Sequence, residues 1–132
     1  MLPIFEDLKK NWWILLVSLF FFALAAGMNA VMDTLTHHFT VSIFAGLNDQ
    51  WWNPAISWTN KNTYSFPWNI VQISDAWHLF KLLMLITIIY TFVFTGRRVV
   101  VTWGRLIVYT ILFGLAWNGS FNLFYNILLI AK

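Results

Sequence analysis

Three long apolar runs dominate this chain of 132 residues and restrict what it can fold into. Residues 12–32 contain no charge, residues 76–95 carry only His78 and Lys81 near their start, and no charged residue lies between Arg105 and Lys132. About 20 apolar residues cross the hydrocarbon core of a bilayer as a helix, which satisfies its own backbone hydrogen bonds. The sequence therefore predicts an all-α integral membrane protein with three transmembrane helices, forming one domain over residues 1–132.

Composition agrees with a membrane protein and excludes several other classes. Charged residues make up 10% of the chain, against roughly 25% in soluble domains. The absence of cysteine excludes disulfides, thiol nucleophiles and iron–sulfur clusters. The net charge of +3 is small and scattered, so we expect no nucleic-acid partner. A cleaved signal peptide is the alternative for residues 12–32, but the run is longer than a typical signal core.

Basic residues predict the orientation of the spans. Lys9 and Lys10 precede the first span, and Arg97, Arg98 and Arg105 lie between the second and third. Because cytoplasmic loops are enriched in Lys and Arg, this pattern predicts a multi-pass protein of the cytoplasmic (inner) membrane. Its N-terminus would be cytoplasmic, and its C-terminus would lie outside the cell membrane.

The flanking segments complete the predicted architecture. The spans are expected at residues 12–38, 75–96 and 99–131. Residues 1–11 fit an amphipathic helix on the inner surface, with a frayed basic terminus as the alternative. The connection 39–74 would lie outside, and it is too rich in aromatic residues for a disordered segment. Its Trp content predicts short helical or re-entrant segments lying at the outer membrane interface, with Pro54 and Pro67 between them.

Polar residues recur at helical spacing near the outer end of each predicted span. They form three stripes, which are Asn29, Asp33 and His37 on the first span, Asp75, His78 and Lys81 on the second, and Asn118, Asn122 and Asn126 on the third. Residues three or four apart share a helix face. A polar stripe facing lipid is costly, so the three faces are predicted to meet in one polar pocket.

The residue types in this pocket are compatible with binding and with chemistry. Asp33, His37, Asp75 and His78 could hold a divalent metal such as zinc, or act as acid and base. The anionic headgroup of a lipid-like amphiphile would be bound by Lys81, Asn29, the asparagines of the third span, and Asn60 and Lys61 of the outer connection. These residues are compatible with binding of the amphiphile alone and with its chemical processing.

Each of these residues also has a purely structural interpretation. Ser74 or Asp75 can cap a helix, Lys81 can extend to the headgroups, and asparagines can bond helices together. The alternative function is therefore a non-catalytic subunit whose polar stripes hold helices together. The helices would belong to one chain, to a homo-oligomer, or to a larger membrane complex.

One sequence pattern is similar to that of a known group of proteins. Residues 53–61 read Asn-Pro-Ala-Ile-Ser-Trp-Thr-Asn-Lys, and residues 75–81 read Asp-Ala-Trp-His-Leu-Phe-Lys. This combination resembles a signature in small bacterial polytopic membrane proteins of unassigned function. The resemblance covers the outer connection and the start of the second span, and it implies no activity.

Overall fold

The computed structural model describes residues 3–59, 74–96 and 103–130, which are almost entirely helical. The long helices are α1 (Pro3–His37), α4 (Ala76–Gly96) and α5 (Trp103–Leu123). The shorter elements are the 3-10 turn η1 (Phe39–Val41), α2 (Asp49–Trp52), α3 (Pro54–Ser57) and the π-helical turn η4 (Phe124–Leu128), which continues α5. Within these residues the only strand-like pairing is an isolated bridge between Ser42 and Ile130.

Three segments are long and apolar enough to cross a membrane, as the sequence predicted. They are Lys10–His37, Ala76–Gly96 and Trp103–Leu128. The predicted all-α fold class and the three apolar helices are therefore confirmed. Asn11 leaves helical geometry at φ −117° and ψ 17° and kinks α1. This kink separates the N-terminal turns from the rest of α1.

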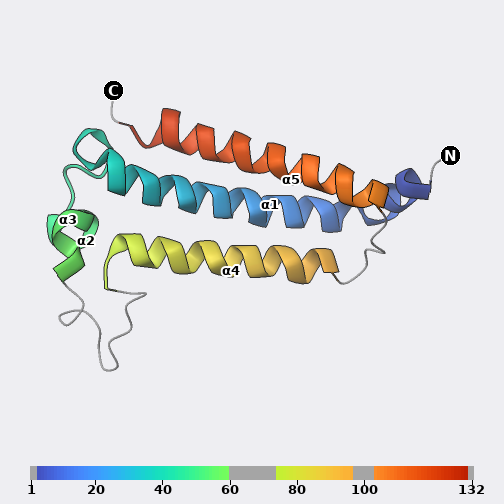
Figure 1. Ribbon diagram of the computed structural model, residues 1–132, viewed down its shortest axis with the longest axis horizontal. Coiled ribbons are helices and arrows are strands. Elements are labelled where there is room, and N and C mark those ends of the chain that lie inside the picture. Colours follow the sequence, from blue (N-terminus) through green and yellow to red (C-terminus); the bar gives the residue numbers. More distant parts are fainter. Residues whose placement is uncertain (1–2, 60–73, 97–102, 131–132) are drawn as a thin grey trace.

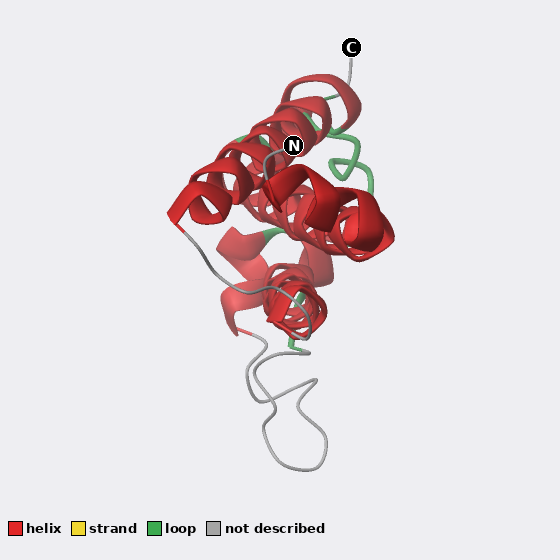
Figure 2. Ribbon diagram, turned by 90° about the vertical axis from the view of Figure 1, so that its right-hand side faces the viewer, coloured by secondary structure: helices red, strands yellow, loops and turns green. Residues whose placement is uncertain are grey.

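The three long helices run side by side, with α1 between the other two (Figures 1 and 2). Helices α4 and α5 each pack extensively against α1 and only weakly against one another. The molecule is therefore an open layer with α4 and α5 at its two edges, and few residues of either edge helix are fully buried.

Two residues through which α1 contacts α4, Ser18 and Phe21, lie on a regular repeat. Along α1 the residues at alternating spacings of four and three are buried or half-buried, and they are Ile14, Ser18, Phe21, Ala25, Met28, Met32 and Leu35. Such spacing keeps one seam of a helix facing a neighbouring helix. Phe21 stacks on Tyr90 and Phe94 of α4, with ring centroids 5.4 and 5.7 Å apart. On the same seam the Thr95 hydroxyl donates a hydrogen bond to Ser18 Oγ at 3.0 Å.

Helix α5 packs against a neighbouring face of α1 that is rich in small residues. Ser120 Oγ donates a hydrogen bond to the Ala23 carbonyl at 2.6 Å. Gly27 lies beneath the Phe124 ring, and a Cβ added at Gly27 would come within 3.2 Å of that ring. Small residues therefore allow the two helices to approach closely, as is common between membrane helices.

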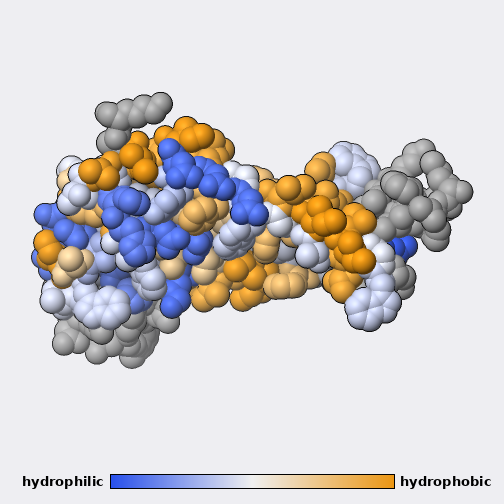
Figure 3. Space-filling model, turned by 45° about the horizontal axis from the view of Figure 1, so that its top comes forward, coloured by the Kyte–Doolittle hydropathy of each residue, from blue (hydrophilic) through white to orange (hydrophobic). Residues whose placement is uncertain are grey.

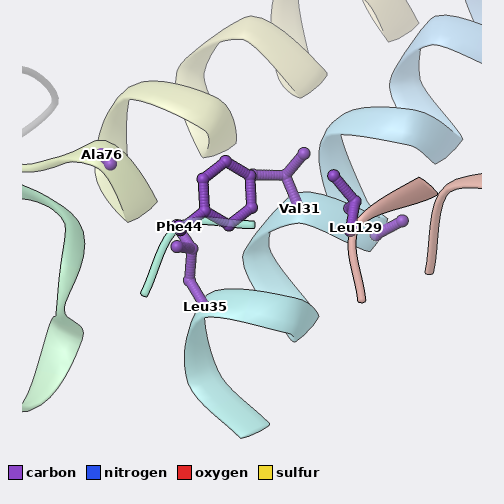
Figure 4. Packing of buried hydrophobic residues seen from close by; sticks show 6 residues of the cluster. Val31, Leu35, Phe44, Ala76 and Leu129 are labelled. Atoms are coloured by element: carbon purple, nitrogen blue, oxygen red, sulfur yellow. The ribbon is translucent and has the colours of Figure 1, made fainter. Parts of the chain in front are cut away.

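The main buried core lies at one end of the layer, where residues 38–59 cover the ends of the helices. We call this the capped end. Its core consists of Ala30, Val31, Leu35, Phe44, Ala76 and Leu129 (Figure 4). Phe44 comes from the connection and stacks on Trp52 at 5.0 Å between ring centroids. The Ile43 amide donates to the Leu129 carbonyl at 2.9 Å, which ties the connection to the segment after α5.

The described part of the connection contains the short helices expected from its sequence. Asn48 caps α2 by accepting from the Gln50 amide at 2.9 Å, and Asn53 caps α3 by accepting from the Ala55 amide at 3.1 Å. Pro54 occupies the first turn of α3, where its missing N–H costs nothing. Hydrophilic side chains gather at the capped end, and apolar side chains cover the middle of the layer (Figure 3).

Candidate functional site

The strongest polar constellation is at the start of α4, where Asp75 is 2% exposed. One oxygen of its carboxylate accepts from the His78 backbone amide at 2.9 Å, so Asp75 is the N-cap of α4. The other oxygen lies 2.7 Å from His78 Nδ1 and accepts from the Ser74 hydroxyl at 3.2 Å. The capping role proposed from the sequence for Ser74 or Asp75 therefore belongs to Asp75.

The bond to Asp75 determines which nitrogen of His78 is presented outward. A carboxylate accepts hydrogen bonds, so the proton between the two groups belongs to Nδ1. In neutral His78 this leaves the lone pair of the ring on Nε2, which is then the hydrogen-bond acceptor. The arrangement is that of a general base whose ring is oriented by a carboxylate, as in the histidine–aspartate half of a catalytic triad.

Aromatic rings and one lysine surround this pair. The His78 ring lies 5.0 Å from the Trp77 ring in an edge-on arrangement and 5.7 Å from the Trp58 ring of the connection. Lys81 Nζ lies 5.1 Å from the centroid of the Trp77 ring, a cation–π contact, while the lysine side chain remains exposed. The second predicted stripe thus forms a compact cluster of Asp75, Trp77, His78 and Lys81.

The predicted stripe on α1 does not complete a metal site with this cluster. Asn29 and Asp33 are half-buried on α1, and His37 is exposed at its end. Among residues 10–59, 74–96 and 103–130, no three His, Asp or Glu side chains come together to hold a metal ion. The expected ligand set of Asp33, His37, Asp75 and His78, and with it the zinc ion, therefore has no structural support.

The asparagines of α5 and of the following turn η4 lie on the surface, where Asn118 also borders a groove between α5 and α4. Asn118, Asn122 and Asn126 are all exposed. They form a ladder in which Asn122 Nδ2 donates to the Asn118 carbonyl at 2.8 Å, and Asn126 Nδ2 donates to Asn122 Oδ1 at 2.8 Å. Leu35, Ala76 and Leu129 meet in the core at the capped end, so the C-terminal end of the third stripe lies toward the same end as the first two stripes. The expected inward direction of the third stripe is wrong.

Sequence reasoning also missed an apolar groove between α4 and α5, away from the capped end. The groove encloses about 640 Å³, with Phe22 of α1, Thr91 and Thr95 of α4, and Arg105 and Tyr109 of α5 among its lining residues. A signal for it exists in the aromatic spacing of Tyr109, Phe113 and Trp117, which places these rings on one face of α5.

Two predicted ligand-binding residues, Asn60 and Lys61, lie outside the described residues, so their place near the cluster stays a prediction. The sequence pattern that includes them also remains only a resemblance. Comparisons with protein-family models, with curated proteins and with solved structures found no match to this chain.

Proposed function

We propose that this protein is a multi-pass membrane protein that binds an anionic amphiphile at the capped end, which faces away from the cytoplasm. The placement of the basic residues supports this orientation. A periplasmic reporter enzyme, alkaline phosphatase, is then expected to be active when fused after residue 59 and inactive when fused after residue 96. The opposite pattern would overturn the orientation.

The observation that carries the binding proposal is the cluster of Asp75, Trp77, His78 and Lys81. Lys81 supplies a positive charge at the end of a helix that is otherwise apolar, and its contact with Trp77 restrains the side chain. His78 lies one turn away on the same face, with its ring oriented by Asp75. An anionic headgroup can accept hydrogen bonds from the Lys81 ammonium and from protonated His78 at Nε2.

The surface beyond this cluster suits the apolar part of such a ligand. Leu85 and Ile89 follow Lys81 at intervals of four residues, so they continue its face along α4. Both side chains are exposed, and no other described helix covers them. A ligand with a charged head at Lys81 and a hydrocarbon chain over Leu85 and Ile89 would match this order of polar and apolar residues.

Native mass spectrometry of the purified protein with added phosphatidylglycerol or phosphatidylcholine tests the proposal. Wild type is expected to retain the anionic lipid preferentially. Lys81→Ala should weaken this retention about tenfold, the effect of losing one charge-assisted hydrogen bond. Lys81→Arg should restore most of it. Lys10→Ala is the matched control. Lys10 is also an exposed lysine, but it lies in the N-terminal part of α1, away from the capped end.

Equal retention of the two lipids by wild type, or the same loss in Lys10→Ala as in Lys81→Ala, would contradict the binding site. The same spectra address chemistry at His78. If the oriented imidazole acts as a general base on the bound amphiphile, a product mass accumulates with wild type and is lost with His78→Ala.

A further inference from the structure

The exposed asparagine ladder of α5 is inconsistent with a face that contacts only lipid. Ser120 points toward α1, since its hydroxyl bonds to Ala23. Asn118 and Asn122 are each two residues from Ser120, about 200° around the helix, and so lie on the opposite side of α5. Because α5 forms one edge of the layer (Figure 1), this side faces away from α1, and Asn118 also borders the groove toward α4.

The depth of these asparagines makes their exposure costly. The candidate span covers Trp103–Leu128, so Asn118 and Asn122 lie about 4 Å and about 10 Å from its middle at 1.5 Å per residue. Both are within the hydrocarbon core, whose half-thickness is about 15 Å. By contrast, the exposed residues at mid-depth on α4 are apolar, as Leu85, Ile89 and Phe92 show.

The ladder leaves hydrogen-bonding groups without a partner inside the chain. Each asparagine amide has two N–H donors and one carbonyl acceptor. Among the described residues, the Asn118 amide group makes no side-chain hydrogen bond, and Asn122 uses one N–H and its carbonyl oxygen. The Asn118 amide and the second N–H of Asn122 therefore remain available at a depth where water is scarce.

The spacing of the same face is that of a helix-pairing seam. Ile111, Leu115, Asn118 and Asn122 follow one another at intervals of four, three and four residues, and all are exposed. This is the repeat that α1 uses to pack against α4, and an asparagine within such a seam fixes register and partner number. On α5 the seam has no partner within the described chain.

We infer that this seam binds the α5 helix of a second copy of the same chain. Copies in one membrane share their orientation, and a two-fold axis along the membrane normal places each residue opposite its own equivalent at the same depth. The amide group is both donor and acceptor, so Asn118 and Asn122 can bond to the same residues of the partner. A second copy of the chain therefore carries matching polar groups at both depths, and no different partner is required to supply them.

Cross-linking of single-cysteine variants in liposomes tests the pairing, because the chain has no native cysteine. Leu115→Cys is expected to form a covalent dimer with a short bis-maleimide. Ile89→Cys is the matched control. The Ile89 side chain is 60% exposed and the Leu115 side chain is 65% exposed, but Ile89 lies on α4. It should cross-link at least about tenfold less.

The asparagines are tested in the Leu115→Cys background. Replacing Asn118 and Asn122 together by leucine should reduce dimer yield about tenfold, the effect expected from losing interhelical hydrogen bonds. Thermal unfolding of this variant should match that of its parent, because both side chains are exposed. Absence of a Leu115→Cys dimer, equal cross-linking at Ile89, or an unchanged yield after the asparagine replacements would each overturn the inference. The asparagine replacements leave Lys81, His78 and the apolar face of α4 unchanged, so their effect on dimer yield is independent of lipid retention.

Discussion

Replacing Asp75 by alanine should destabilise the protein through two separate losses. The N-cap hydrogen bond to the His78 amide is removed, which costs about 1 kcal/mol. The bond between the carboxylate and His78 Nδ1 is also removed, and hydrogen bonds to charged groups contribute about 1.5–3 kcal/mol. The expected decrease in the free energy of unfolding is therefore about 2.5–4 kcal/mol, measured by denaturant titration in mixed micelles with Trp fluorescence as the signal.

The Asp75→Asn variant separates these two contributions. Asparagine caps helices about as well as aspartate, so this variant keeps the cap and loses only the charge of the bond to His78. Its expected cost is about 1–2 kcal/mol. Asp49→Ala is the control, because Asp49 is exposed in the short helix α2 and should change stability by less than about 0.5 kcal/mol. Equal costs for Asp75→Asn and Asp75→Ala, or a cost of Asp75→Ala below 0.5 kcal/mol on the same scale, would refute this reasoning.

Two further substitutions test the packing of the layer. Gly27→Leu should cost about 1–3 kcal/mol, because its side chain must displace the Phe124 ring that lies against α1. Gly46→Ala, where no atom lies within 4 Å, should leave the same unfolding curve unchanged. Phe44→Ala should cost about 3–5 kcal/mol because it empties the core at the capped end. Val41→Ala, at an exposed position of the same connection, should have little effect, and a similar loss in both variants would contradict the specific role of Phe44.

The lengths of the long helices could be predicted from the sequence because they depend on hydrophobic run length. The apolar runs that follow Lys10 and Arg105 correspond to the helices α1 and α5. The spacing of Asp75 and His78 correctly placed these two residues on one turn at the start of α4. Capping by Asp75 was also accessible, since the residue directly precedes an apolar run.

The direction of the third stripe was not predictable in the same way. Periodicity shows that Asn118, Asn122 and Asn126 share a face, but it does not show what that face meets. The assumption that polar stripes point inward holds for a closed bundle. Here α4 and α5 both pack against α1 and leave an open layer, so a polar face can point outward toward another chain. The groove beside Phe22 was missed for the same reason, because it depends on the separation of α4 and α5.

The bond between Ile43 and Leu129 has a consequence for the order of assembly during synthesis. The core at the capped end combines Ala30, Val31, Leu35, Phe44 and Ala76 with Leu129, which is translated more than 50 residues after Ala76. Until Leu129 has been synthesised and has reached that side of the membrane, the core remains incomplete. The contacts between α1 and α4 use residues that are synthesised before this core can be completed. The long seam of α1, from Ile14 to Leu35, is formed entirely by residues already available at that stage.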